Sequence, residues 1–147
     1  MKLDQSRPIV FLFSHPNHEV AAFGMIKRTQ PCRVIYMTDG GGEHRVNETK
    51  RVLSQIGLGE NAVFLNRSED SFYNGILNLD CDYFEALSET IKNLLKNLAR
   101  PYIFCDAVEF YNPVHDMTLP IATSLGRLST IFEVPLVYED VNGDTFV

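Results

Sequence analysis

Two histidines lie three residues apart around a proline in the segment SHPNHE, which spans residues 14–19 and directly follows the apolar run IVFLF. The chain has four histidines, and a third one, His115, lies in the segment NPVH. Both segments fit the pattern F-x-[H/N]-P-x-H-[E/D], as FSHPNHE and FYNPVHD. Because neutral imidazoles are good ligands for zinc and similar divalent ions, His15, His18 and His115 are candidate ligands of one metal ion.

Hydrophobic periodicity predicts the elements that must hold these histidines in place. Apolar runs typical of buried strands occur at residues 8–13, 33–37, 62–65, 102–105 and 134–138. Helical spacing of apolar residues occurs at residues 20–28, 45–56, 83–98 and 118–132. This alternation predicts an α/β fold of the three-layer, Rossmann-like kind, in which helices cover both faces of a mostly parallel sheet.

Each histidine segment lies between a predicted strand and a predicted helix. In a parallel sheet such loops emerge at the carboxyl edge, where α/β proteins bind ligands. We therefore expect His15, His18 and His115 to converge there, with one coordination position open for water. The spacing also leaves open that they are three polar loop residues at a sheet edge, because HxxH alone is a weak pattern.

Composition restricts the class of protein. The chain has 147 residues, of which 45% are apolar and 22% charged, and this balance predicts one globular domain over residues 1–147. The net charge of -6 argues against a nucleic acid or an anionic membrane as partner. The first residues are polar, and no apolar run approaches the roughly 18 residues of a membrane-spanning helix. With three widely spaced cysteines and no CxxC, we expect a cytoplasmic protein with reduced thiols and no transmembrane segment.

Several segments resemble motifs of the PIG-L/LmbE-like deacetylase family, which includes N-acetylglucosaminyl-phosphatidylinositol de-N-acetylase. SHPNHE resembles the family's AHPDDE motif, and NPVH is similar to its HPDH motif. VIYMTDGG resembles the family's second strand and TDG loop, and VFLNRSED resembles its short strand and following acidic loop. Arg45-x-x-Glu48, followed by a helix that ends in IGL, also matches, and the order of the segments agrees over roughly residues 8–139.

The resemblance implies a metal-dependent amidohydrolase that removes acetyl groups from N-acetylated amino sugars on lipid, thiol or glycan carriers. It puts His15, His18 and His115 at the family's three ligand positions, with histidine replacing the usual aspartate at position 18. Zinc (Zn2+) is the metal that the family usually contains, and nickel or iron would accept the same imidazoles. The implied substrate is a small-molecule amino-sugar conjugate, and the domain is short at its carboxyl end compared with relatives.

The family's proton-transfer positions differ in this sequence. The general base of AHPDDE corresponds to Asn17, an amide that cannot accept a proton from water. The first histidine of HPDH corresponds to Asn112, which can still donate a hydrogen bond to an oxyanion, and its aspartate corresponds to Val114. Asp116, beside His115, is a candidate replacement for the base, and a carboxylate of the glycine-rich loop, Asp39 or Glu43, is another. The other interpretation of Asp116 is a carboxylate that interacts with a helix dipole.

Three further side chains are candidate substrate contacts. Arg45 matches a substrate-binding position of the family, or it only pairs with Glu48 at i, i+3. Asp39 belongs to a glycine-rich loop that should border the same edge of the sheet. Tyr111 is an aromatic loop residue that either lines a sugar pocket or packs at its border.

Three functions remain open from the sequence. The first is a metal-dependent hydrolase of an N-acyl amino-sugar conjugate. The second is a noncatalytic relative that binds a glycan or a protein partner, because the base is lost at Asn17 and the sequence stops soon after the last predicted strand. The third is a nucleotide or sugar-phosphate binder, although the three glycines at 40–42 lack the Lys-Ser/Thr of a P-loop. A homo-oligomer is compatible with each of them.

Overall fold

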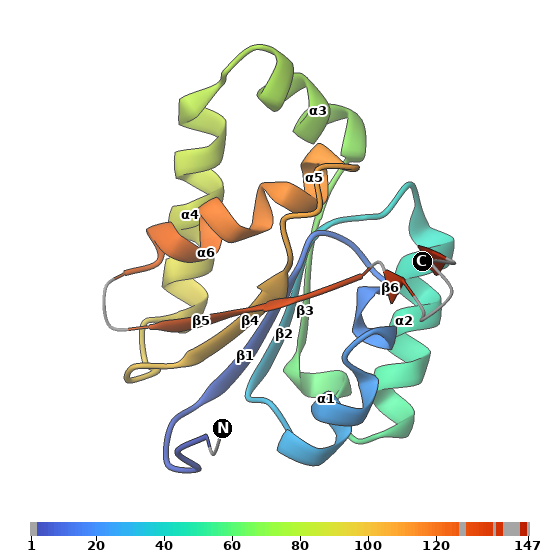
Figure 1. Cartoon of the computed structure of the whole chain (residues 1–147), viewed down its shortest axis with the longest axis vertical. Helices are drawn as coiled ribbons and strands as arrows, with labels where there is room; N and C mark the ends of the chain where they lie inside the picture. The colour runs from blue at the N-terminus through green and yellow to red at the C-terminus, as the bar shows by residue number, and fades with distance from the viewer. Residues whose placement is uncertain (1–2, 127–128, 137, 140–144, 147) are drawn as a thin grey trace.

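A five-stranded parallel sheet forms the centre of the molecule in the computed structural model, which describes residues 3–126, 129–136, 138–139 and 145–146. The strand order is β3-β2-β1-β4-β5, and every neighbouring pair is parallel. The strands are β1 (Ile9–Phe13), β2 (Arg33–Thr38), β3 (Ala62–Arg67), β4 (Tyr102–Asp106) and β5 (Thr130–Val134). A two-stranded antiparallel pair consists of β6 (Tyr138–Glu139) and β7 (Thr145–Phe146). The predicted α/β class with a parallel sheet is confirmed (Figure 1).

Helices cover both faces of the sheet, which confirms the three-layer architecture. One face packs against α1 (Phe23–Thr29) and α2 (Glu43–Gln55). The other packs against α3 (Glu69–Leu77), α4 (Cys81–Leu95), α5 (Pro113–Asp116) and α6 (Thr118–Ser124). Short 3-10 turns, η1 (His18–Val20) and η2 (Gly59–Asn61), precede α1 and β3. Among the helices in the described part of the chain, none combines the length and the apolar character needed to cross a membrane.

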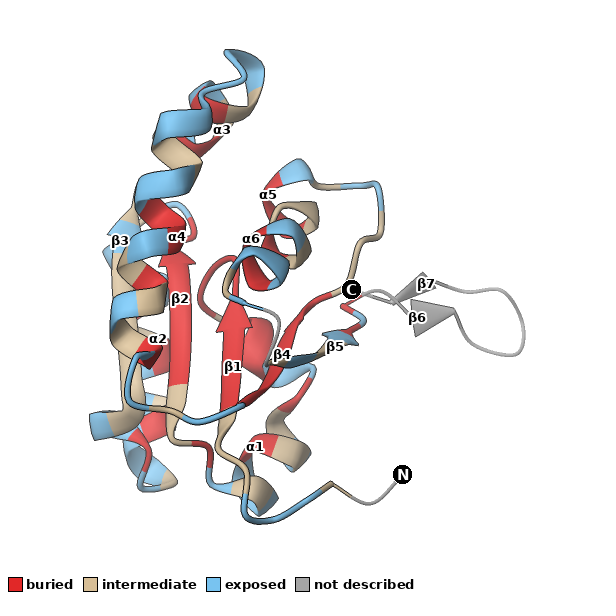
Figure 2. Ribbon diagram, turned by 90° about the vertical axis from the view of Figure 1, so that its left-hand side faces the viewer, coloured by how far each residue is buried: buried red, intermediate tan, exposed pale blue. Residues whose placement is uncertain are grey.

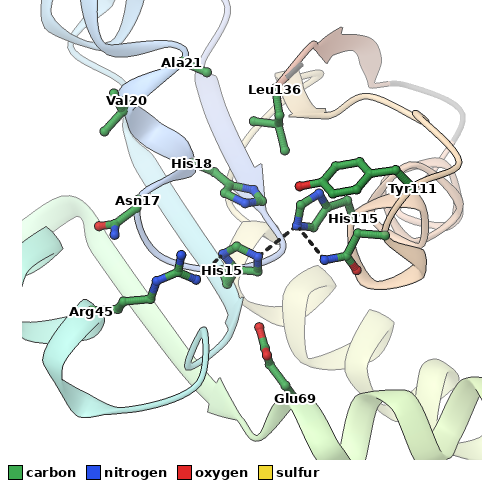
Figure 3. A pocket seen from close by; sticks show the side chains of 11 residues that line it. His15, Asn17, His18, Val20, Ala21, Arg45, Glu69, Tyr111, His115 and Leu136 are labelled. Atoms are coloured by element: carbon green, nitrogen blue, oxygen red, sulfur yellow. Dashed lines mark hydrogen bonds between the residues drawn. The ribbon is translucent and has the colours of Figure 1, made fainter. Parts of the chain in front are cut away.

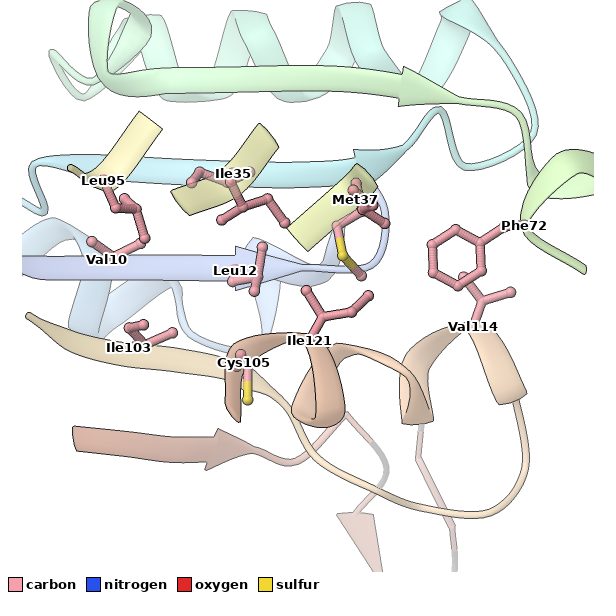
Figure 4. Packing of buried hydrophobic residues seen from close by; sticks show 13 residues of the cluster. Val10, Leu12, Ile35, Met37, Phe72, Leu95, Ile103, Cys105, Val114 and Ile121 are labelled. Atoms are coloured by element: carbon pink, nitrogen blue, oxygen red, sulfur yellow. The ribbon is translucent and has the colours of Figure 1, made fainter. Parts of the chain in front are cut away.

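The central strands are apolar on both faces because helices cover both. Along β1, Val10 and Leu12 pack toward α4 and α6, whereas Phe11 and Phe13 pack toward α1 and α2. Figure 2 shows β1, β2 and β4 buried along most of their length. In Figure 4, Ile121 of α6 lies over the side chains of these strands. This two-sided burial explains why the first strand appears in the sequence as an uninterrupted apolar run.

The helix predicted at residues 118–132 is shorter than expected. It begins at Thr118 as predicted but ends at Ser124. Gly126 then adopts a φ of 128°, a conformation that glycine accepts without strain and that does not continue a helix. The sequence prediction followed apolar spacing through this glycine and therefore overran the end of the helix.

The last strand of the sheet was predicted at residues 134–138 and lies instead at 130–134. Its first three residues, Thr130-Ile131-Phe132, are β-branched or aromatic side chains that favour strands. Pro135 has no backbone N–H for the ladder, so the strand ends at Val134. The register, with Tyr102 opposite Thr130, keeps this strand parallel to β4.

An additional helix, α3, occupies part of the segment that the sequence analysis assigned to an acidic loop. Its N-cap is Ser68, whose Oγ accepts the backbone N–H of Ser71 at 3.2 Å. Phe72 is completely buried against the face that carries α4, α5 and α6. The N-cap and this buried side chain hold the start of α3 beside the carboxyl edge of the sheet.

The strands that follow β1 in the sequence lie on both sides of it, with β2 and β3 on one side and β4 and β5 on the other, and this topology positions the candidate site. β1 pairs with β2 on one side and with β4 on the other. The connection after β1 leads to α1 on one face, and the connection after β4 leads to α5 on the opposite face. Open parallel sheets form a ligand-binding crevice at such a switch point. The first connection carries His15 and His18, and the second carries His115.

Candidate metal centre

The three predicted histidines converge at the carboxyl ends of β1 and β4 (Figure 3). One ring nitrogen from each of His15, His18 and His115 lies within 4.8 Å of the other two, and all three residues are buried. The ring centroids are 3.8 Å apart for His15–His18, 4.4 Å for His18–His115 and 4.9 Å for His15–His115. The predicted convergence is confirmed, although His15 and His115 are 100 positions apart in the chain.

Asp106, the last residue of β4, fixes the ring of His18. Its Oδ2 lies 3.0 Å from Nδ1 of His18 and also accepts the backbone N–H of Ser14 at 2.7 Å. The carboxylate can only accept here, so Nδ1 of His18 carries the proton and Nε2 presents its lone pair. Carboxylate–histidine pairs of this kind orient metal-binding imidazoles and raise their basicity.

The other two histidines face each other through their Nε2 atoms, which are 2.9 Å apart. Nδ1 of His15 is 3.2 Å from the carbonyl oxygen of Pro16, which can only accept, so we assign the proton of His15 to Nδ1. The longer, 3.5 Å contact from Arg45 Nη1 would need the opposite tautomer, and the shorter contact decides the assignment. Nε2 of His115 is 3.1 Å from Nδ2 of Asn112, which can only donate. Two lone pairs therefore oppose each other, an arrangement that a shared cation stabilises.

Burial keeps two of the imidazoles uncharged. Desolvation, and secondarily the neighbouring His18, lowers the pKa of His15 from 6.5 to about 3. The same two causes lower the pKa of His115 to about 4. Nδ1 of His115 has no hydrogen-bond partner among the residues that the structure describes. Neutral imidazole is the form that coordinates metals, so both rings can bind an ion at neutral pH.

The dimensions of the cluster fit a small divalent ion after a modest adjustment of the rings. Zinc–nitrogen bonds of about 2.0–2.1 Å put two tetrahedral ligand atoms ~3.3 Å apart. The ligand atoms of this cluster lie within 4.8 Å of one another, and the closest pair is separated by 2.9 Å. Three nitrogen ligands suit zinc, copper, iron or nickel, so the cluster could hold a metal ion, and its geometry does not select one metal.

A cavity of about 780 Å³ opens onto the histidines. Its remaining lining includes the polar side chains of Asn17, Arg45, Glu69 and Asn112 and the apolar or aromatic side chains of Val20, Tyr111 and Leu136. The volume lies in the range of small-molecule sites, which combine apolar walls with a few converging polar groups. Four of the six predicted non-histidine site residues thus lie around the cluster.

Asn17 lines the cavity with its backbone in the left-handed region, at a φ of 80°. Asparagine tolerates this conformation better than most residues. Its N–H donates to Oγ1 of Thr49 at 3.2 Å, and the Thr49 hydroxyl lies 3.2 Å from the side-chain oxygen of Asn17. The same hydroxyl lies 2.9 Å from Glu19, which also accepts from the hydroxyl of Tyr36 at 3.0 Å. This buried network holds the loop that carries His15 and His18.

The side-chain amide of Asn112 has a defined orientation. Its oxygen accepts the backbone N–H of Val114 at 2.9 Å and the hydroxyl of Tyr73 at 3.2 Å. Its nitrogen is therefore the atom that faces His115. In this orientation Asn112 can donate a hydrogen bond to a group bound beside the cluster, which is compatible with the role predicted for it.

Two predicted acidic residues do not line this cavity. Oδ1 of Asp116 accepts the backbone N–H groups of Glu109 and Phe110 at 2.9 and 3.2 Å, so Asp116 holds the turn before α5. Asp39 accepts the N–H of Gly41 at 3.0 Å and borders a separate, smaller cavity beside α2. Both are close to the site along the chain, but proximity in sequence does not determine where a side chain points. The structure gives the Asp116 carboxylate a structural position instead of one facing the cluster.

The predicted substrate contacts Arg45 and Tyr111 do lie in the cavity. Arg45 donates to the carbonyl oxygen of Gly40 at 3.2 Å. Its alternative partner, Glu48, is instead 3.5 Å from His44. The ring of Tyr111 packs edge-on against His115, with centroids 5.3 Å apart, and remains about half exposed.

Sequence reasoning missed two residues of the site, Asp106 and Glu69. Asp106 could have been noticed as an acidic residue that ends an apolar strand at the same edge as the histidines. Glu69 belongs to the segment SED after the third strand, which was noted only as an acidic loop. Neither signal reveals the direction of the side chain, so neither would have been decisive.

Comparisons with known proteins do not assign this site. No protein-family model, no curated protein and no solved structure matched the chain. The likeness to the PIG-L/LmbE-like family therefore depends on short motifs, and the geometry of the three histidines is a separate reason to expect metal binding.

Proposed function

We propose that this protein is a metal-dependent amidohydrolase that removes an acyl group from an N-acylated amino-sugar conjugate. The observation that carries the proposal is the convergence of three buried imidazoles beside a cavity of about 780 Å³. Three neutral protein ligands leave one coordination position for water or substrate, which is typical of catalytic zinc sites. The substrate class comes from the motif resemblance, and the polar lining of the cavity is compatible with it.

His15, His18 and His115 would hold the ion, and zinc is the metal that we expect. A zinc ion in such a site lowers the pKa of its water and polarises a carbonyl group. Asp106 keeps the lone pair of His18 directed at the cluster. Asn112 donates from Nδ2 to the acyl oxygen as that oxygen gains negative charge.

The rest of the cavity lining offers groups that suit a sugar. Arg45 and Asn17 provide donors and acceptors for hydroxyl groups, and Tyr111 provides an aromatic face. Polar side chains placed on an otherwise partly apolar wall fix the orientation of a small ligand. This combination fits the amino-sugar part of the proposed substrate.

A second candidate is a noncatalytic protein that binds the same class of ligand. The observation in its favour is Asn17, an amide at the position where the resembling family has its base. An amide cannot take a proton from water. In this case the histidines would hold an ion that contributes to ligand binding or to stability alone.

Metal analysis tests the first step of the proposal. Protein purified without added metal should contain about one equivalent of zinc or a related ion by elemental analysis, and His115→Ala should lose it because two imidazoles remain. His44→Ala is the matched control, because His44 is exposed on α2 and outside the cluster. Equal metal content in wild type and His115→Ala would refute the site.

An activity assay separates the two candidates. The zinc-loaded protein should release acetate from N-acetylglucosamine conjugates, and both His115→Ala and chelator treatment should abolish the release. Retention of metal together with no hydrolysis of any such conjugate would reject the hydrolase and favour the noncatalytic alternative.

A further inference from the structure

Glu69 is the one carboxylate among the described residues that line the cavity beside the histidines. It is the first residue of α3, directly after β3. Figure 3 shows its carboxylate pointing from the helix toward His15. No hydrogen bond or ion pair to another described residue engages it. The charge is therefore available to a ligand in the cavity.

The other acidic side chains near the cluster are already engaged. The carboxylate of Glu19 accepts hydrogen bonds from the hydroxyl groups of Tyr36 and Thr49. Asp106 interacts with His18. Asp116 accepts two backbone N–H groups of the preceding turn. A carboxylate committed in this way cannot exchange protons with a substrate without breaking the contacts that hold the site.

The position of Glu69 is fixed relative to the cluster. Tyr73 lies four residues further along α3, on the same face of the helix, and its hydroxyl donates to Asn112 at 3.2 Å. Asn112 in turn contacts His115. Phe72 and Val114 belong to the same buried core, which joins α3 to α5. The face of α3 that carries Glu69 is thus linked directly to the element that carries His115.

We propose that Glu69 is the proton acceptor of the hydrolytic reaction, at a place in the fold different from position 17. This inference rests on the proposed function. As the oxygen of water bonds to the acyl carbon, the Glu69 carboxylate takes one proton from that water. As the carbon–nitrogen bond breaks, the proton passes to the leaving nitrogen, and Glu69 returns to its ionised form. Amide and water become a carboxylic acid and an amine, and the acid then gives its proton to the amine to form carboxylate and ammonium, so neither an oxidant nor a further reactant is needed.

The assignment accounts for the amide at Asn17. If the proton is accepted from the side of α3, residue 17 is free of that task and can serve the loop through its contacts with Thr49. Glu69 then supplies the negative charge of the cavity lining, and Asn17 is an uncharged amide elsewhere in the same lining. On this assignment the protein can catalyse hydrolysis although Asn17 replaces the carboxylate that the resembling family has at this position.

Glu69→Gln is the direct test, because glutamine keeps the shape of the side chain and removes its ability to accept a proton. With zinc-loaded protein and an N-acetylglucosamine conjugate, kcat should fall by about 10²–10⁴-fold, the usual contribution of a general base. Metal content by elemental analysis and the Kd for the same conjugate by calorimetry should stay unchanged. Asp70→Asn is the matched control, since Asp70 is exposed in the same first turn and should leave kcat unaltered.

Each other outcome contradicts the assignment in a distinguishable way. An active wild type with an equally active Glu69→Gln variant overturns the role of Glu69 and leaves the proposed function standing. Loss of metal in Glu69→Gln shows that the residue supports the metal site and does not transfer protons. A wild type that carries metal, binds the conjugate and never hydrolyses it overturns the proposed function together with this inference.

Discussion

The chemistry of single residues at this site depends on which nitrogen of each ring carries a proton. Asp106 settles the tautomer of His18, Pro16 that of His15 and Asn112 that of His115. In each case a neighbour that can only accept or only donate leaves one lone pair facing the cluster. The lone pairs of the three ring nitrogens therefore already face the cluster when no ion is bound. Residues next to the ligands therefore matter as much as the ligands.

Asp106→Asn should weaken metal binding although it removes no ligand. The amide no longer holds the His18 ring with a charged acceptor, and loss of such a partner typically costs 10–100-fold in metal affinity. Competition with a chromophoric chelator measures the change. Asp39→Asn, which alters an acid outside the cavity, should bind as tightly as wild type; an Asp106→Asn protein of unchanged affinity would show that the His18 contact is irrelevant.

Asn17→Asp should restore activity to the Glu69→Gln variant. It returns a carboxylate to position 17 in the lining of the same cavity, where the Thr49 hydroxyl can still donate to it. We expect kcat to rise by at least about tenfold over the Glu69→Gln parent, in line with the contribution of a positioned base. Asn17→Ser in the same background should give no gain, and absence of rescue by aspartate would mean that position 17 cannot act on the substrate.

At the scale of elements, the site depends on loops that must adopt one conformation. The loop after β2 approaches the histidine loop at Gly40, which has a φ of 65°. A Cβ built there would lie 3.2 Å from side-chain atoms of Arg45, His15 and Pro16. The backbone conformation favours glycine at this position, and an added Cβ would crowd the three neighbouring side chains.

Gly40→Ala and Gly24→Ala form a pair with opposite expectations. The first should lower the free energy of unfolding by at least about 1 kcal/mol, because alanine is strained at this φ and crowds its neighbours. The second lies in α1 with no atom within 4 Å of an added Cβ, and alanine should stabilise the helix by up to about 1 kcal/mol. Urea denaturation measures both, and equal changes in the same direction would contradict the local explanation.

The sequence predicted elements best where periodicity and burial agree. The strands at residues 9–13 and 33–38 and the helix at 81–95 were located within a few residues, because each carries an unbroken apolar run or stripe. The last strand was misplaced and the helix before it was overrun, since Pro135 ends the strand and Gly126 follows the end of the helix, and apolar spacing does not encode such backbone geometry. The three histidines were found because they share a repeated motif. Glu69 and Asp106 were missed because their roles depend on tertiary placement alone.

At the scale of the whole molecule, the neighbouring strands β1 and β4 bring together a site whose residues are distant in sequence. The cluster lies at the carboxyl ends of β1 and β4, and its three histidines are buried. Desolvation by burial lowers the pKa of His15 and of His115, and it favours the neutral form of these two rings. The overall stability of the metal-free protein is therefore linked to the protonation of the site.

The metal-free protein should lose stability as the pH falls below about 6.5, the usual pKa of histidine in an unfolded chain. Folding lowers the pKa of His15 to about 3 and of His115 to about 4, so the unfolded state takes up these protons first. Their stabilising effect is complete above that pH and is lost as the pH falls toward these folded-state values. The urea midpoint should decline less steeply between pH 7 and 5 for the double variant His15→Asn/His115→Asn than for the wild type. Identical dependence of the midpoint on pH in the two proteins would contradict the linkage.

The origin of the ligands on two separate connections has a consequence for how the chain holds together. Two of these histidines lie in the segment after β1 and one in the segment after β4, so an ion bound to all three would act as a removable cross-link between early and late parts of the polypeptide. An unfolded chain offers only the weaker HxxH pair, and ligands that bind the native state alone stabilise it by mass action, by about 2.7 kcal/mol at a hundredfold excess over Kd. Resistance to a protease should therefore rise and fall with the supply of metal.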